Sequence, residues 1–476
     1  MPAPHSNTHA APAAPPNWAP DSWRSKLHAQ QIVYPDRAAV DAAYARLRTL
    51  PPLVTSWEIE RLKAQIAEAQ QGKRFLLQGG DCAEQVGDCR AESIASKLKI
   101  LLQMSVVLVY AGKKPVIRVG RFAGQYAKPR SSTTETRTID GVPVTLPSYY
   151  GDLVNRPEFT PEARRPDPTH MLAGHAHAAM TLNFIRALLD GGFADIHHPE
   201  YWDLGFMAHA GLPGDLRDEY QRMTERLAEG LRFMEAIGER TVEQLHSVEF
   251  FTSHEGLNLL YESAHTRTVP RRDGCYNLAT HLPWLGERTR SIDGAHVEYF
   301  RGIRNPIGVK IGPTTAPEDI VSLLRVLNPE REAGKIVLIV RLGAKHTRAK
   351  LPGVIGAVRD SPEAGPVLWS CDPMHGNSTT TANGTKTRSF AEITEELEAS
   401  WDVHQACGSR LGGVHFELTG EDVTECLGGA RGLSEADLAR NYQSPCDPRL
   451  NYEQSLELAF LLARRMQRNG GRHGDR

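Results

Sequence analysis

The chain has 476 residues, and its 55 Lys and Arg against 57 Asp and Glu leave a formal net charge of −2. With 40% hydrophobic and 24% charged residues it has the composition of an ordinary globular protein, which excludes a chain that is disordered throughout. The balanced charge argues against nucleic acid as a partner, and the longest apolar runs, such as 336–340, are too short to cross a membrane.

Both ends of the chain differ in composition from its middle. Residues 1–22 are rich in Pro and Ala and lack the charged-then-apolar pattern of a signal peptide, so we expect a disordered leader. The Gly-rich, charged tail 469–476 is expected to be frayed. Seven cysteines, an odd number scattered along the chain, argue against a secreted disulfide framework and for a reducing compartment. We therefore expect a cytoplasmic protein.

Two helical patterns follow the leader, over Arg37–Leu50 and Trp57–Gln71. Ser56 is the expected N-cap of the second helix, and Gly72 lies at its end, where glycine commonly stops a helix. Together they predict an N-terminal helical extension over residues 23–72.

Eight short apolar runs then recur along the chain and predict strands. They are continuous rather than alternating, as expected of parallel strands that are buried on both faces. The runs are Phe75–Gln78, Val116–Val119, Glu249–Thr252, Thr280–Trp284, Gly308–Ile311, Ile336–Val340, Val367–Ser370 and Gly413–Glu417. Helical stretches separate most of them, for example Ala91–Tyr110, Pro317–Leu327 and Phe390–Cys407, and an amphipathic helix over Tyr452–Gln467 closes the pattern. Eight strand–helix units predict the α/β class and a (β/α)8 TIM barrel over residues 73–468.

The alternation of strand and helix is interrupted after the second strand, between Gln125 and Ser247. Two helical patterns occupy this stretch, at about His170–Leu189 and Arg217–Ile237. We expect a helical insertion within about residues 190–245, a common place for oligomer contacts or regulation.

Side chains of metal-binding types follow three of the predicted strands. Cys82 follows the first strand, His375 the seventh, and Glu417 ends the eighth, while Asp447 is a candidate fourth ligand. Because the carboxyl ends of barrel strands converge on one mouth, these residues are expected to meet there. One thiolate, one imidazole and two carboxylates suit a borderline divalent ion such as Mn²⁺, Co²⁺, Fe²⁺ or Zn²⁺. Spacing alone leaves open that Cys82 is a buried hydrophobe and His375 a hydrogen-bonded loop residue.

Cationic side chains gather at the same strand ends. Such a cluster at a barrel mouth would bind phosphate or carboxylate groups, and a solvated charged rim is the alternative. The candidates are Arg121, Lys128, Arg130, Arg288, Lys310, Arg341 and Lys386.

Histidines elsewhere are weaker candidates for catalysis. His175 and His177 lie two apart in a helical stretch and so face different directions. His197-His198 lies in a loop, and His254-Glu255 lacks the second histidine of a zinc protease motif.

Six long motifs resemble the class II 3-deoxy-D-arabino-heptulosonate 7-phosphate (DAHP) synthases. Three of them are Gln78-Gly-Gly-Asp-Cys82-Ala-Glu84, Arg118-Val-Gly-Arg121-Phe-Ala-Gly-Gln-Tyr-Ala-Lys128-Pro-Arg130-Ser131 and Gly286-Glu287-Arg288-Thr-Arg290. The others are Asp372-Pro-Met-His375-Gly-Asn377, Thr419-Gly-Glu-Asp-Val-Thr-Glu425-Cys and Cys446-Asp447-Pro-Arg-Leu-Asn451. The resemblance runs from about Trp23 to Met466.

The resemblance implies a transferase that carries out the first step of the shikimate pathway, toward chorismate and the aromatic amino acids. Phosphoenolpyruvate, D-erythrose 4-phosphate and water would give DAHP and phosphate. The implied cofactor is one divalent ion per subunit, Mn²⁺ or Co²⁺, with Zn²⁺, Fe²⁺ or Cd²⁺ as alternatives. The implied metal ligands are Cys82, His375, Glu417 and Asp447. Phosphoenolpyruvate would be held by Arg121, Glu287, Arg288, Lys310 and Arg341. Erythrose 4-phosphate would be held by Lys128, Arg130, Ser131 and Lys386, and the implied catalytic residues are Lys128 and Glu287.

The residue types suit this chemistry. Both substrates are anions, so binding them side by side needs several fixed cations. A divalent ion can polarise the aldehyde that the methylene carbon of phosphoenolpyruvate attacks. Glu287, beside Arg288, is a candidate to position or deprotonate the water that follows, although the sequence does not decide this.

The family also implies a homodimer or homotetramer, aromatic amino acids as feedback inhibitors, and a chorismate mutase as a partner. Which effector acts, and whether the pathway is primary or specialised, stays open at this point. Two other functions compete: a metal-dependent phosphohydrolase or other aldolase on the same barrel, and a catalytically silent scaffold. A scaffold would be expected to lack some ligands, whereas all four are present.

Overall fold

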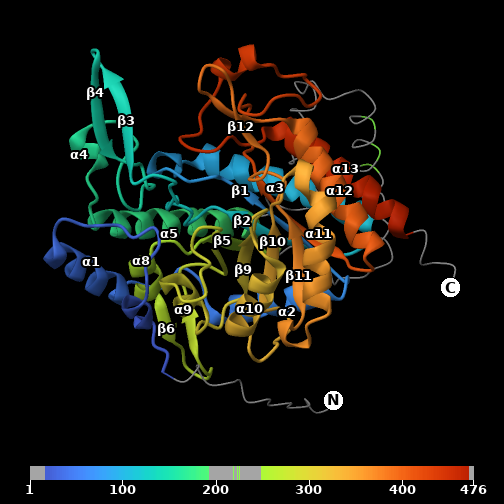
Figure 1. Ribbon diagram of the computed structural model, residues 1–476, viewed down its shortest axis with the longest axis horizontal. Coiled ribbons are helices and arrows are strands. Elements are labelled where there is room, and N and C mark those ends of the chain that lie inside the picture. Colours follow the sequence, from blue (N-terminus) through green and yellow to red (C-terminus); the bar gives the residue numbers. More distant parts are fainter. Residues whose placement is uncertain (1–16, 192–217, 219–221, 223–224, 226–247, 471–476) are drawn as a thin grey trace.

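A closed barrel of parallel strands forms the centre of the computed structural model, which describes residues 17–191, 218, 222, 225 and 248–470 (Figure 1). The strand order around the barrel is β1-β14-β11-β10-β9-β8-β5-β2. These strands are β1 (Phe75–Gly80), β2 (Val116–Arg121), β5 (Phe251–Glu255), β8 (Leu282–Leu285), β9 (Ile307–Ile311), β10 (Ile336–Val340), β11 (Val367–Cys371) and β14 (Leu411–Glu417). Each predicted run forms one of these strands, so the predicted (β/α)8 barrel is confirmed.

Helices follow the strands and cover the barrel from outside (Figure 1). They are α3 (Ala91–Gly112), α5 (Thr169–Asp190), α8 (Leu259–Ala264), α9 (Ala295–Phe300), α10 (Pro317–Leu327), α11 (Ala344–Arg359), α12 (Phe390–Ala406) and α13 (Tyr452–Gly470). The last helix packs on α3, and α11 packs on α12. Within the described ranges, α3 alone has the length and apolarity to cross a membrane, and 67% of its most apolar stretch is buried inside the protein.

The two N-terminal helices, α1 (Arg37–Thr49) and α2 (Ser56–Gln70), lie close to where they were predicted. The second closes the end of the barrel at which the strands begin. Gln70 donates from Nε2 to the Pro366 carbonyl, ahead of β11, and accepts from the Gly334 N–H, ahead of β10. Leu62 and Ile66 pack against apolar side chains inside the barrel.

The predicted N-cap of α2 was wrong by one residue. Thr55, and not Ser56, occupies this position, because its hydroxyl oxygen accepts the Glu58 N–H at 3.3 Å. The Glu58 carboxylate in turn accepts the Thr55 N–H at 2.7 Å, which completes a capping box.

Three antiparallel hairpins in the described part of the chain were not predicted. They are β3 (Thr134–Ile139) with β4 (Val142–Pro147), β6 (Thr266–Thr268) with β7 (Cys275–Asn277), and β12 (Ser378–Thr380) with β13 (Lys386–Arg388). The first pair stands out from the barrel, beside α4 (Pro161–Arg164) (Figure 1). Asp140 and Gly141 form its turn with φ angles of 50° and 80°, which is the backbone of an Asp-Gly type I′ hairpin. The stretch after β2 therefore begins with a hairpin rather than with helices alone.

Several predicted segments lie largely outside the described residues. These are the leader up to residue 16, the helical insertion at 190–245 with its helix Arg217–Ile237, and the tail from residue 471. The domain boundaries that rest on them stay predictions. The predicted helix at His170–Leu189 is present as α5.

The register of the strands aligns the ends that form the mouth. Gly80 at the end of β1 pairs with Glu417 of β14 on one side and with Arg121 of β2 on the other. The Gly80 φ of 145° is one that L side chains rarely adopt, and a Cβ there would lie 2.9 Å from Phe122. Both the backbone angle and the space therefore favour glycine at the position where β1 lies between Arg121 and Glu417.

Candidate active site at the mouth of the barrel

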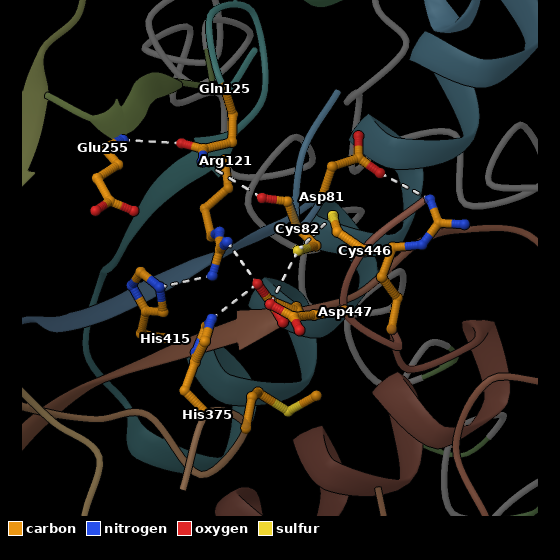
Figure 2. A network of polar contacts seen from close by, with 12 residues as sticks. Asp81, Cys82, Arg121, Gln125, Glu255, His375, His415, Cys446 and Asp447 are labelled. Atoms are coloured by element: carbon orange, nitrogen blue, oxygen red, sulfur yellow. Dashed lines mark hydrogen bonds and ion pairs between the residues drawn. The ribbon is translucent and has the colours of Figure 1, made fainter. Parts of the chain in front are cut away.

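Three of the predicted metal ligands meet at the mouth. One ligand atom each from Cys82, Glu417 and Asp447 lies within 4.8 Å of the others, and all three side chains are buried. The fourth, His375, places Nε2 at 2.9 Å from Oε1 of Glu417. The sequence-predicted set therefore comes together in space, and Figure 2 shows Cys82, His375 and Asp447 of this set.

Cations surround the carboxylates of this cluster. Arg121 donates from Nη2 to Glu417 Oε1 at 2.9 Å, and Arg388 Nη2 lies 2.7 Å from Glu417 Oε2. Burial alone would raise the pKa of Glu417, but His375, Arg388 and Arg121 hold it well below its usual range. Burial likewise would raise the pKa of Asp447, and the ammonium of Lys128 is foremost in keeping it low. Both groups are therefore carboxylates at neutral pH, the form that binds a metal ion.

The orientation of His375 is set by a neighbouring acid. Its Nδ1 lies 2.8 Å from Oδ2 of Asp372, which directs Nε2 toward Glu417. Burial would raise the pKa of Asp372, but His375 and Lys310 hold it well below its usual value. A carboxylate behind an imidazole is the arrangement that orients histidine ligands in metal sites. The donor set of one sulfur, one imidazole nitrogen and two carboxylates fits a borderline divalent ion.

The side chains assigned to phosphoenolpyruvate lie beside this cluster on neighbouring strands. Lys310 of β9 lies 3.0 Å from Nε2 of His415 and also pairs with Asp372. Burial lowers the pKa of Lys310 to about 8, against the attraction of Asp372. Arg341 donates from Nη2 to the His375 carbonyl at 2.5 Å.

Trp284 on β8 and the charged residues that follow this strand extend the group. The Trp284 ring lies under the Arg121 guanidinium, with 5.2 Å between the guanidinium carbon and the ring centroid. Glu287 accepts a hydrogen bond from Nη2 of Arg290 at 2.9 Å, and its other carboxylate oxygen is buried without a hydrogen-bond partner. The Arg288 side chain is exposed at the rim.

The side chains assigned to erythrose 4-phosphate divide into two groups. Lys128 and Lys386 reach the buried cluster, where their ammonium groups pair with the two carboxylate oxygens of Asp447. Lys128 also lies 2.7 Å from the Cys82 sulfur. Arg130 is half-buried and Ser131 exposed, so they lie nearer to solvent than the two lysines.

Several site residues were missed by the sequence analysis. Glu255 is the last residue of β5, and Gln125 accepts its N–H at 2.8 Å (Figure 2). Burial raises the pKa of Glu255, although Lys128, Lys310, Arg121 and Arg288 act in the opposite direction. The sequence analysis considered His254-Glu255 only as part of a zinc protease motif and overlooked a carboxyl group among the cations.

His415 and Arg388 were also missed. His415 bridges the site from inside the barrel, with Nε2 at 2.7 Å from Arg121 Nη1 and Nδ1 at 2.8 Å from Gln78 Oε1. His415 lies two residues before Glu417, and side chains two apart on a strand share a face. Its position on the same face as a predicted ligand could therefore have been read from the sequence. Arg388 lies on the short hairpin strand β13 and had no comparable signal.

The Cys446 thiol points into the site. Its sulfur lies 3.0 Å from the Cys82 sulfur, and neither cysteine is in a disulfide (Figure 2). The site therefore holds two thiols next to each other, one of them from a candidate ligand.

Comparisons with known proteins point in the same direction as this geometry. A model of the class-II DAHP synthetase family matches residues 18–463. The chain is 50% identical over 462 residues to a phospho-2-dehydro-3-deoxyheptonate aldolase of Neurospora crassa, covering 94% of each chain. It is 46% identical over 445 residues to the Streptomyces coelicolor protein of the same name, covering 94% of this chain and 96% of the relative. It is also 43% identical over 450 residues to phospho-2-dehydro-3-deoxyheptonate aldolase AroG of Mycolicibacterium smegmatis, covering 93% of each.

Proposed function

The chain belongs to the class-II DAHP synthetase family, and we propose that the buried cluster at the mouth of its barrel is the catalytic centre. The enzyme condenses phosphoenolpyruvate with D-erythrose 4-phosphate and water to give DAHP and phosphate, the first step of the shikimate pathway. The observation that carries the site assignment is the convergence of Cys82, Glu417 and Asp447 within 4.8 Å, among buried cations.

Four residues would hold the metal ion: Cys82, His375, Glu417 and Asp447. The ionised state of both carboxylates and the orientation of His375 by Asp372 support this assignment. Bound there, a divalent ion would act as a Lewis acid on the aldehyde oxygen. We assign Mn²⁺ or Co²⁺, with Zn²⁺, Fe²⁺ and Cd²⁺ as alternatives, because the mixed sulfur, nitrogen and oxygen donors suit borderline ions.

Phosphoenolpyruvate would bind beside this cluster. Its phosphate and carboxylate need fixed cations, which Arg121, Lys310 and Arg341 offer from β2, β9 and the end of β10, with Arg288 at the rim. Arg121 and Lys310 are already held by His415, so little side-chain entropy is lost when the anion binds. Holding both substrates in register then contributes to the rate.

The carboxyl group of Glu287 is proposed to handle the attacking water. Arg290 holds one carboxylate oxygen, while the other, which is buried and has no hydrogen-bond partner among the described residues, would accept from the attacking water. On the aldose side, Lys128 and Lys386 would bind erythrose 4-phosphate together with Arg130 and Ser131. Lys128 is proposed to direct its proton toward the aldehyde oxygen, because its ammonium lies between two ligands of the cluster.

Further properties are proposed from the family alone. These are assembly into a homodimer or homotetramer, feedback inhibition by aromatic amino acids, and association with a chorismate mutase. A cytoplasmic location is proposed too, and the free state of all seven cysteines supports a reducing compartment.

Substrate dependence tests the function. Phosphoenolpyruvate consumption and phosphate release are measured with and without erythrose 4-phosphate, in the presence of Mn²⁺. A synthase consumes phosphoenolpyruvate only when the aldose is present and releases one phosphate per molecule. Release of phosphate without the aldose would instead indicate a phosphohydrolase, and no turnover under either condition would indicate a scaffold.

A further inference from the structure

The segment before α1 lies along the barrel and is anchored at several points. We call residues 17–36 the N-terminal strap. Trp18 donates from Nε1 to the Glu298 carbonyl at 2.9 Å, and the Leu27 carbonyl accepts the Ala295 N–H at 2.9 Å. His28 makes an edge contact with the ring of His296, 5.1 Å between centroids. The strap is therefore seated on α9 along part of its length.

One residue of the strap holds a residue of the candidate aldose site. Gln30 donates from Nε2 to the Arg130 carbonyl at 2.9 Å and accepts the Arg130 N–H on Oε1 at 2.7 Å. Among the described residues, Arg130 makes both of its main-chain hydrogen bonds to this one side chain. An amide that engages the N–H and the C=O of one residue fixes the plane of its backbone, as a neighbouring strand would do.

The backbone of Gln30 is itself in an uncommon conformation. Its φ of 58° lies in the left-handed region, which few residues other than Gly, Asn and Asp adopt. Such a conformation persists only where surrounding contacts impose it, and it tends to occur at functional sites. Here the strap is anchored before Gln30 at Leu27 and after it at Tyr34, whose hydroxyl accepts from Asn258 Nδ2 at 3.2 Å.

The neighbours of Arg130 are held mainly on either side of it, as far as the described residues show. On one side, the Lys128 N–H donates to the Tyr150 carbonyl at 2.8 Å, and on the other the Ser148 N–H donates to the Thr133 carbonyl at 3.0 Å. Between these two points the chain turns from the buried site toward the exposed hairpin β3–β4. The Ser132 carbonyl accepts from the Ser148 hydroxyl at 2.8 Å, and at Arg130 itself the Gln30 amide fixes the backbone.

We propose that Gln30 is a positioning residue of the sugar-phosphate subsite, which sets the direction of the Arg130 side chain. This inference rests on the proposed role of Arg130 in binding erythrose 4-phosphate. In this proposal the N-terminal strap is a part of the active site, because it supplies the contact that orients Arg130, an anion-binding side chain. Gln30 acts through Arg130 and does not touch the substrate.

The test uses the full-length enzyme loaded with Mn²⁺. Gln30→Asn shortens the side chain by one methylene so that it cannot reach both groups, while asparagine tolerates the left-handed backbone. We expect the KM for erythrose 4-phosphate to rise about tenfold, because a misdirected Arg130 side chain would lose one hydrogen-bonded contact to the charged phosphate. The KM for phosphoenolpyruvate is expected to change less than about twofold. Gln31→Ala, at the exposed neighbouring residue, is the matched control and is expected to leave both constants unchanged.

A double-mutant cycle separates positioning from stability. In an Arg130→Ala background, Gln30→Asn is expected to cause no further rise in the KM for erythrose 4-phosphate, because its effect passes through the missing side chain. Equal rises in both KM values together with a lower Tm, or additive effects in the double variant, would overturn the inference and leave Gln30 a structural anchor. If Arg130→Ala alone leaves this KM unchanged while Lys386→Ala raises it, the assignment of Arg130 fails, and the inference fails with it, but the synthase function stands.

Discussion

The ammonium of Lys128 lies 2.7 Å from the sulfur of Cys82 and also pairs with the carboxylate of Asp447. Burial would lower the pKa of Lys128, but Asp447 and the two neighbouring cysteines raise it well above its usual value. One lysine assigned to the aldose therefore touches two residues assigned to the metal. The two proposed subsites would therefore lie directly beside each other, which suits a reaction that joins the molecules bound in them.

Removal of the metal ion is expected to abolish turnover. A chelator should inactivate the enzyme, and Mn²⁺ or Co²⁺ should restore activity, because the ion is the proposed activator of the aldehyde. Cys82→Ser is expected to weaken Mn²⁺ binding by on the order of 100-fold, since one ligand and its soft donor are lost. Calorimetric titration of Mn²⁺ into apo enzyme measures this directly.

The control for the metal experiment is Cys407→Ser, at a half-buried cysteine outside the proposed site. It is expected to bind Mn²⁺ as the wild type does. Full activity in thoroughly metal-free wild-type protein would contradict the assignment.

Substitution of the cations should separate the two substrates. Lys310→Ala and Arg341→Ala are expected to raise the KM for phosphoenolpyruvate by on the order of tenfold to 100-fold, because each removes a charged contact to an anion. Lys386→Ala is expected to act mainly on the KM for erythrose 4-phosphate. Steady-state kinetics with each substrate varied in turn measures both constants.

Arg325→Ala is a control for these substitutions, because Arg325 is on the outer helix α10 and pairs with Glu363 at the surface. It is expected to leave both KM values unchanged, since an exposed pair contributes little. If the three cation variants unfold instead of losing substrate affinity, these residues have a structural role.

The barrel could be predicted from the sequence because its strands are continuous apolar runs separated by helices. That the candidate ligands meet could also be predicted, since strand ends converge on one mouth and carry Cys82, His375 and Glu417. The register in which neighbouring strands pair could not be predicted in this way. The position of Gly80 between Glu417 and Arg121 depends on how neighbouring strands align, which no single run encodes.

Contacts between distant segments were likewise not predictable. Gln30 and Arg130 are separated by 100 positions, and nothing in the composition of either segment indicates the pair. The short hairpin that carries Arg388 lacks a periodic pattern long enough to reveal a strand. Glu255 and His415, by contrast, sit at or near strand ends and could have been found by the same rule that located Glu417.

Oxidation of the metal-free enzyme is expected to block its reactivation by Mn²⁺. The sulfurs of Cys82 and Cys446 lie 3.0 Å apart, so a small movement brings them to the about 2.05 Å of a disulfide bond. A bound ion would occupy the Cys82 thiolate and block the reaction. We expect apo enzyme treated with mild oxidant to stay inactive when Mn²⁺ is added back, and to regain activity only after dithiothreitol and Mn²⁺, whereas enzyme oxidised in its Mn²⁺-loaded form keeps its activity. Mass spectrometry should find the peptide that links Cys82 with Cys446.

Cys446→Ser is the matched variant for this experiment, because it removes one thiol and leaves Cys82 in place. After the same oxidation, its apo form is expected to regain activity when Mn²⁺ is added back without any reductant, whereas the wild type needs dithiothreitol as well. Loss of wild-type activity without the linked peptide would contradict the prediction.

Acid is expected to destabilise the fold through buried histidines. Burial lowers the pKa of His404 from 6.5 to about 4, so between these values the unfolded chain binds a proton that the folded chain does not. The free energy of unfolding therefore falls as the pH falls from 6.5 to 4, by up to about 3 kcal/mol for this group. His404→Asn should reduce this slope in urea unfolding between pH 7.5 and 4, whereas His346→Asn, at an exposed histidine, should not. An unchanged slope in His404→Asn would mean that the buried ring does not carry the effect.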